Sequence, residues 1–189
     1  KIQEEIGLKT HILSPDMEAK LAYQGGACGL ELPKGPIAIV KIGSNTIEAV
    51  MRDGEGIHHS QTLRFGCVDL TEIHFGKHPE KYAMQQLSQF RMDTSSKLAL
   101  FNWPARPREL IFVGGAAMAI ATMEFNIESH NPHQVHGHKM TRAQLRMWGD
   151  RLMVTSPTSR RKMCPAHVGK ADYMLAAARL MDLVCEKSL

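Results

Sequence analysis

The stretch that decides the fold is residues 37–48, which read IAIVKIGSNTIE. An apolar run breaks at Gly43 into a turn of small and polar residues, and a second apolar run follows at once with Glu48 close to its start. Small residues in such a turn let backbone N–H groups approach an anion closely. The layout therefore predicts a hairpin that binds phosphate at its turn.

The sequence around this hairpin predicts a meander of three strands and one later strand. The meander strands are expected at about 37–43, 46–52 and 56–64. Asp53-Gly54 is a hairpin signal between the last two of them. A further apolar strand at 109–113 ends at Gly114-Gly115, and we expect it to join the sheet beside the first strand.

Helix signals lie on both sides of the meander. Ser14-Pro15 is typical of a helix cap and first residue, with Gly25-Gly26 as the stop, and Thr141 with Gln144 forms a capping box. Further helices are expected at about 79–101, 116–123 and 141–152, from 157 onward, and from 170 to the C-terminus. Residues 37–42 are apolar on both faces, which predicts a strand buried between two helical layers.

Composition limits the classes of partner. The 189 residues are 43% hydrophobic and 22% charged, with a formal net charge of +4, which is ordinary for one globular domain. No apolar run approaches the roughly 20 residues of a membrane span, and no dense basic block indicates nucleic-acid binding. The cysteines are Cys28, Cys67, Cys164 and Cys185. They lack C-x-x-C spacing, which favours reduced thiols and a cytoplasmic location.

Taken in order, these motifs resemble the Ppx/GppA phosphatases, the exopolyphosphatase and guanosine pentaphosphate phosphohydrolase group. The matching segments are 14–21, 41–48, 65–75, 113–117 and Ala171-Asp172. The resemblance implies an α/β fold, namely one lobe of an actin-like ATPase (ribonuclease H-like) fold with a mixed sheet and helices on both faces. It also implies that residues 1–189 are the second lobe of a longer protein, with the first lobe and a final strand and helix absent.

The resemblance carries a set of site residues. Glu18 matches the glutamate proposed as catalytic base, and Glu48 matches the glutamate that closes the glycine motif. The phosphate-binding turns correspond to Gly43, Ser44, Asn45, Thr46, Gly114 and Gly115. From the residues alone, Glu18 also fits a first-turn carboxylate that complements a helix dipole. Gly114-Gly115 likewise fits a plain strand-to-helix corner.

Three departures from the family pattern concern this site. Lys41 stands where the family has the aspartate that holds the metal, and lysine cannot ligate Mg²⁺, which takes oxygen ligands. Ser44 and Asn45 replace glycines, which narrows the turn, and Met17 replaces a glutamate. Mg²⁺ is expected for the family, but this sequence offers no metal ligand at the family's position.

Two functions remain open from the sequence. One is a lobe of a phosphohydrolase that cleaves phosphoanhydride bonds of polyphosphate or of guanosine penta- or tetraphosphate. The other is a catalytically inactive relative that keeps phosphate or nucleotide binding, or an interaction role, and Lys41 favours it. We expect this chain alone to be inactive, with the absent first lobe as its partner and a homodimer as a further arrangement. A sugar-kinase-like or chaperone-like lobe is disfavoured, because the Glu18 helix directly precedes the meander.

Two other clusters attract attention. His130, His133, His136 and His138 have spacings that suit a transition metal, but no Asp or Cys joins them, so a polar loop is the favoured interpretation. The run Arg160-Arg161-Lys162 predicts a solvated helix face, with binding of a phosphate chain as the less favoured alternative.

Overall fold

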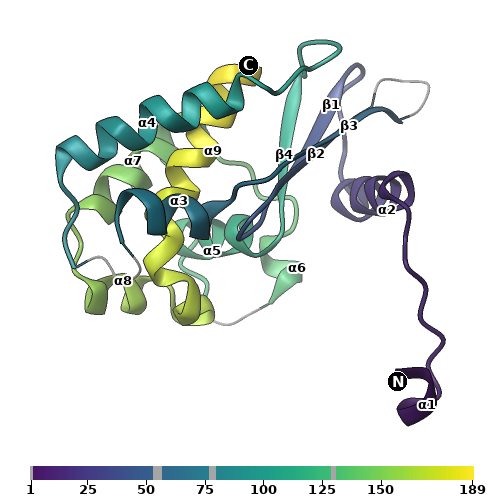
Figure 1. Ribbon diagram of the computed structural model, residues 1–189, viewed down its shortest axis with the longest axis horizontal. Coiled ribbons are helices and arrows are strands. Elements are labelled where there is room, and N and C mark those ends of the chain that lie inside the picture. The colour runs from purple at the N-terminus through teal and green to yellow at the C-terminus, as the bar shows by residue number, and fades with distance from the viewer. Residues whose placement is uncertain (1, 53–56, 77–79, 129–130) are drawn as a thin grey trace.

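The computed structural model describes residues 2–52, 57–76, 80–128 and 131–189 (Figure 1). The Asp53-Gly54 hairpin signal, Pro79 and His130 lie outside the described residues. The centre of the fold is a four-stranded mixed sheet with the order β3-β2-β1-β4.

The predicted meander is confirmed. β1 (Ile37–Ile42), β2 (Ile47–Arg52) and β3 (Ile57–Leu63) pair antiparallel in sequence order. β4 (Glu109–Val113) pairs parallel to β1, which places it beside the first strand as the sequence predicted. Parallel strands end at the same edge of a sheet, so the turns after β1 and β4 lie next to each other.

The prediction that the first strand is buried on both faces is also confirmed. On one side, Ile39 and Val50 pack against Ala19 and Tyr23 of α2 (Pro15–Ala27). On the other side, Val40 and Ile42 join the main core. Figure 1 shows α2 beside one face of the sheet and α3, α4, α7 and α9 on the opposite side. Successive side chains of β1 point to opposite faces of the sheet, and because nearly all of them are apolar, both faces are buried.

The larger helical layer is built around the C-terminal helix α9 (Met174–Ser188), which contacts α3, α4, α5 and α7. These four helices are α3 (Cys67–His74), α4 (Met84–Leu98), α5 (Gly115–Glu124) and α7 (Arg142–Met153). The shorter elements are α1 (Ile2–Ile6), α6 (Pro132–Val135), α8 (Pro157–Met163) and a 3₁₀ segment, η1 (Pro165–Tyr173). No described helix has the length and apolar character that crossing a membrane requires.

Capping residues fix the helix starts as expected. The Ser14 hydroxyl accepts from the Met17 N–H at 3.3 Å, and Thr141 and Gln144 form the predicted capping box. Such caps satisfy N–H groups that have no partner within the helix.

Three helix boundaries differ from the sequence prediction. The helix expected over 79–101 is only α4, because the Ala83 N–H bonds to the Gln86 side chain and begins the helix there. The last helix begins at Met174 rather than near Lys170, since a kinked 3₁₀ segment precedes it. α2 continues through both glycines to Ala27 because Gly26 packs on the sheet.

The prediction of a solvated Arg160 is wrong. Its side chain is fully buried, with the guanidinium 4.8 Å from the Tyr82 ring centroid. It also donates to the Thr155 carbonyl at 3.1 Å and lies 3.5 Å from the Asp172 carboxylate. The neighbouring Arg161 side chain is half exposed, as expected. A carbonyl, a carboxylate and an aromatic face together make burial of this charge tolerable.

Candidate functional site

The two turns predicted to bind phosphate lie side by side. Lys41, next to the last residue of β1, is in register with Val113, the last residue of β4. A Cβ atom on Gly114 would lie 3.5 Å from Cγ of Lys41, so the lysine stem runs past the glycine corner. The turn at residues 43–46 and the turn at Gly114-Gly115 therefore open at the same edge of the sheet.

At this edge Glu18, Lys41 and Glu48 come together. Lys41 donates from Nζ to Oε2 of Glu48 at 2.9 Å across paired strands. The same Nζ lies 4.0 Å from Oε1 of Glu18, which projects from the first turn of α2. Thr46 donates from Oγ1 to the other Glu48 oxygen at 3.0 Å. The two candidate carboxylates, Glu18 and Glu48, thus form one cluster with Lys41, the residue that differs from the family pattern.

These residues do not fit Mg²⁺. Both oxygens of Glu48 already accept hydrogen bonds, and one of the donors is a cation that approaches Glu18 as well. A hard divalent ion needs several oxygen ligands free of a competing positive charge. Within the described part of the chain, no group of three or more His, Cys, Asp or Glu side chains is placed to hold a metal.

Two histidines of the predicted loop, His136 and His138, make contacts with other parts of the chain. The His136 ring nitrogen Nε2 lies 2.6 Å from the Cys28 carbonyl oxygen, which ties the loop to the end of α2. His138 stacks on Phe125 with ring centroids 4.0 Å apart. The polar-loop interpretation accounts for both contacts.

The turn after β1 is locked to the start of α3. The N–H groups of Cys67 and Val68 donate to the carbonyls of Gly43 and Ser44, each at 3.0 Å. Asn45 donates from its side chain to Asp69 at 2.6 Å. The first N–H groups of α3 are therefore occupied by the turn's carbonyls, and the Asn45 amide is directed at α3 rather than at the turn's outer edge.

Gly66 makes this contact possible, which the sequence did not reveal. A Cβ atom there would lie 2.4 Å from backbone atoms of Gly43 and Ser44. Only glycine allows the two backbones to approach so closely. The turn's own N–H groups at Ser44 and Asn45 donate to no acceptor within the described residues.

The start of α5 supplies the second half of the edge. Gly114 adopts a left-handed φ of 88° and turns the chain directly from β4 into α5. The first N–H groups of a helix have no partner within it and carry the positive end of its dipole. In α5 these N–H groups lie at the N-terminal end of the helix, next to Gly114 and Gly115.

Lys170 is the site residue that sequence reasoning missed. A Cβ atom on Gly115 would lie 1.7 Å from Nζ of Lys170, so this ammonium lies against the first residue of α5. Burial raises the pKa of the Cys67 thiol, and the nearby Lys170 charge opposes that rise. Lys170 directly precedes Ala171-Asp172 and stands where the resembled family has an arginine. This correspondence is the sequence signal that could have identified Lys170 as a site residue.

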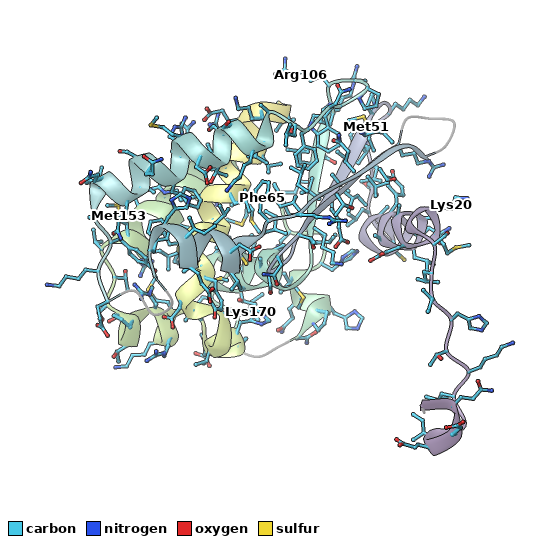
Figure 2. The ribbon with its side chains drawn as sticks, viewed as in Figure 1. Lys20, Met51, Phe65, Arg106, Met153 and Lys170 are labelled. Carbon is cyan, nitrogen blue, oxygen red and sulfur yellow. The ribbon has the colours of Figure 1, made fainter. Side chains whose placement is uncertain are left out.

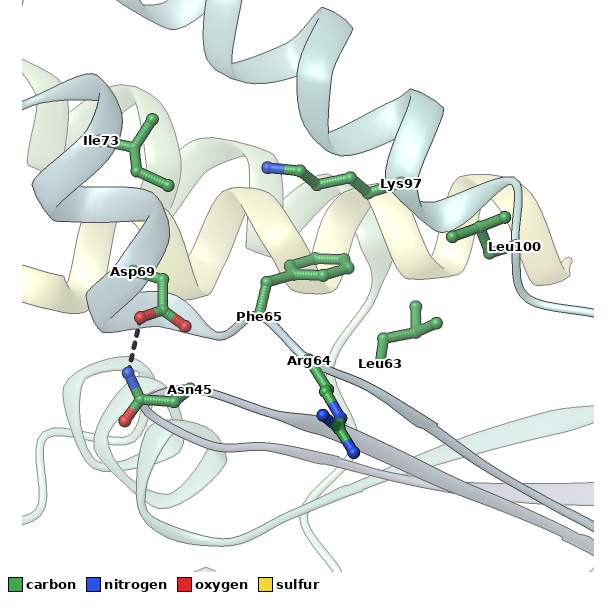
Figure 3. A pocket seen from close by; sticks show the side chains of 8 residues that line it. All are labelled: Asn45, Leu63, Arg64, Phe65, Asp69, Ile73, Lys97 and Leu100. Atoms are coloured by element: carbon green, nitrogen blue, oxygen red, sulfur yellow. Dashed lines mark hydrogen bonds between the residues drawn. The ribbon is translucent and has the colours of Figure 1, made fainter.

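A shallow hollow of about 540 Å³ lies on the β3 side of the turn (Figure 3). Its lining is Asn45, Leu63, Arg64, Phe65, Asp69, Ile73, Lys97 and Leu100. It shares only Asn45 with the predicted site, and Lys97 is held by Asp93 at 2.7 Å. The clustered charges of the candidate site lie outside it.

A mixed sheet with a hairpin turn after its first strand and a glycine corner after the parallel fourth strand is the architecture of one lobe of an actin-like ATPase fold. The chain belongs to the Ppx/GppA phosphatase family, whose model matches residues 1–187.

Solved structures agree with this assignment. A Ppx/GppA family member from Aquifex aeolicus is 25% identical, with a TM-score of 0.84 over 98% of this chain and 59% of that one. An exopolyphosphatase-like protein (18% identity, TM-score 0.82, 99% and 59% coverage) shares the fold. An exopolyphosphatase from Cytophaga hutchinsonii does so too (14%, 0.72, 98% and 60%). This chain spans about three fifths of these structures. No curated protein matches it.

Proposed function

We propose that residues 1–189 form the second lobe of a Ppx/GppA-type protein. Its role is to bind the phosphoanhydride chain of inorganic polyphosphate or of guanosine penta- or tetraphosphate. The observation that carries the proposal is the arrangement of two ammonium groups, Lys41 and Lys170, beside two turns at one sheet edge. Phosphate is the ligand whose charge and oxygen acceptors suit such an edge.

The sheet edge offers a phosphate both backbone N–H donors and positively charged ammonium groups. The open N–H groups of the turn at 43–46 and the first turn of α5 can donate to phosphate oxygens, as backbone nests and helix starts do. An ammonium near the positive end of a helix leaves a concentration of positive charge that an anion neutralises. A linear polyphosphate could contact both turns with successive groups.

Hydrolysis by this chain alone is not part of the proposal. Phosphoryl transfer depends on positioning and charge neutralisation from both sides of the reacting group. The chain contributes one lobe, and Lys41 stands where the family holds its metal. We expect binding without turnover, with the first lobe as the natural partner. A homodimer and a cytoplasmic location also remain predictions.

The test uses the purified chain with inorganic tripolyphosphate and guanosine pentaphosphate. We expect calorimetric binding, and we expect no phosphate release above the protein-free blank whether or not Mg²⁺ is present. Lys170→Met should weaken binding about tenfold, which corresponds to a loss of about 1.4 kcal/mol of binding free energy. Lys162→Met, an exposed lysine on α8, should change binding by less than twofold. Absence of binding, or equal losses in both variants, would contradict the proposal.

Glu18 favours a second candidate, hydrolysis by a complete two-lobed protein. Its side chain is 58% exposed and its only described ion pair is the 4.0 Å approach to Lys41, so it could accept a proton from water. Turnover of polyphosphate by the full-length protein, lost in Glu18→Gln, would support this candidate. If the full-length protein is inactive and the triple variant Lys41→Asp, Ser44→Gly and Asn45→Gly restores turnover, the altered turn is the cause.

A further inference from the structure

We propose that Lys41 is the resident cation of this site. Its ammonium supplies to a bound phosphate the positive charge that a divalent metal would otherwise supply, so the anion binds without metal. This inference rests on the proposed phosphate binding and specifies its chemistry.

The first support is the place of the ammonium between carboxylates from two different elements. Glu48 comes from β2 and lies 2.9 Å from Nζ, while Glu18 comes from α2 and lies 4.0 Å away. A cation held by carboxylates from separate elements is the usual setting of a bound metal ion. Here the cation is covalently part of the chain.

The second support is that Lys41 is held in place and still accessible. The strand pairing sets its backbone, the Glu48 carboxylate fixes its tip, and the open corner at Gly114 leaves room for its stem. Its side chain remains 41% exposed. An ammonium has three N–H donors, and the described hydrogen bond uses one of them. The remaining donors are available to a phosphate oxygen.

The third support is charge. Replacing an aspartate by a lysine changes a site from one negative to one positive charge, and that difference equals the charge of one Mg²⁺ ion. The lysine site without metal therefore has the same formal charge as an aspartate site with metal. A point charge such as ammonium binds phosphate well, but it cannot organise and activate water as a metal does. Binding is kept and metal-assisted chemistry is not.

The experiment measures binding of inorganic tripolyphosphate to the chain in buffer with EDTA. We expect wild-type binding in EDTA, at least tenfold weaker binding by Lys41→Met, and binding within about threefold of wild type by Lys41→Arg. The matched control is Lys20→Met, which removes an exposed lysine on α2 (Figure 2) and should change affinity less than twofold. Unchanged thermal transitions verify that each variant is folded.

A second measurement uses Mg²⁺ alone. Wild type should show no heat of Mg²⁺ binding and no Mg²⁺-dependent rise in melting temperature, while Lys41→Asp should show both. Tripolyphosphate binding that requires Mg²⁺, or Lys41→Met binding as tightly as wild type, would overturn the inference and leave the proposed function standing. No binding in either buffer would overturn both.

Discussion

The Asn45 side-chain amide donates to the Asp69 carboxylate at 2.6 Å, and the second oxygen of that carboxylate accepts from the Gly66 N–H at 3.1 Å. This contact ties the turn after β1 to the first turn of α3. It gives Asn45, a residue that departs from the family's glycine, a structural use within the lobe. The turn is held in place by contacts within the chain itself.

Asn45→Ala should therefore destabilise the lobe modestly. The lost hydrogen bond is charge-assisted but lies at an exposed position, so a cost of about 1 kcal/mol is expected. In a domain of this size that lowers the melting temperature by about 2–4 °C. Ser44→Ala is the control, because no described side-chain hydrogen bond involves Ser44. Thermal denaturation should separate the two variants, and equal transitions would show that the contact contributes nothing.

The two adjacent glycines of α2 should respond in opposite directions to alanine. A Cβ atom on Gly25 meets nothing within 4 Å, so Gly25→Ala should stabilise the helix by about 0.5–1 kcal/mol. A Cβ atom on Gly26 would lie 2.9 Å from methyl groups of Ile39 and Val113, so Gly26→Ala should push α2 from the sheet and destabilise the lobe. Chemical denaturation measures both. A stabilised Gly26→Ala would mean that α2 packs less closely than described.

The sequence was sufficient for the sheet and insufficient for contacts between distant segments. Short apolar runs on both sides of the turn at Gly43 predict β1 and β2, and side chains that are apolar on both faces predict burial of β1 on both sides. The start of the last helix could not be predicted near Lys170, since the 3₁₀ segment depends on packing with α8 and α5. The boundary error at α4 has a different origin, a local cap in which the Ala83 N–H bonds to the Gln86 side chain.

The site was partly predictable for a related reason. Glu18, Glu48 and the two turns could be proposed because each lies in a recognisable motif, and the structure brings them to one edge. Their roles in binding or catalysis stay predictions. Lys170 reaches the same edge from a segment with no phosphate motif, and only tertiary packing places it against Gly115.

Stability should fall above about pH 8.5 because of buried thiols. Burial raises the pKa of Cys185 to about 11, and it raises the pKa values of Cys67 and Cys164 as well. An unfolded thiol has a pKa near 8.5, so between that pH and 11 the native state keeps protons that the unfolded state releases. The free energy of unfolding therefore decreases as pH rises through this window.

Cysteine variants isolate this effect. Cys185→Ala should reduce the decline in the free energy of unfolding between pH 8 and about 10, and Cys28→Ala, which removes an exposed thiol, is the control substitution. Burial also raises the pKa of Tyr82 to about 12, so this residue adds to the decline near pH 10, but it does so equally in wild type and in the cysteine variants. Urea denaturation at several pH values measures the slopes. Identical slopes in wild type and Cys185→Ala would contradict the assignment to this thiol.

Arg160 and Arg161 should differ sharply despite being neighbours on α8. Arg160 is fully buried on the Tyr82 ring and beside Asp172, and burial raises the Tyr82 pKa to about 12. Arg160→Met leaves the Asp172 carboxylate, whose side chain is 14% exposed, without its buried cationic neighbour. Removing one partner of a buried ion pair costs about 3–5 kcal/mol, so the melting temperature should fall by about 6–20 °C.

Arg161→Met removes the same charge from a half-exposed position 3.8 Å from Asp172, where a contribution of about 0–1 kcal/mol is expected. The pair is matched in residue type, helix and acidic neighbour, so a difference in unfolding free energy reports the buried setting of Arg160, including its contacts with Thr155 and Tyr82. The double variant Arg160→Met with Asp172→Asn should recover part of the loss, because the largely buried side chain that has lost its nearer cation is then neutral. Equal melting temperatures for the two single variants, or no recovery in the double variant, would mean that the buried pair does not stabilise this end of the core.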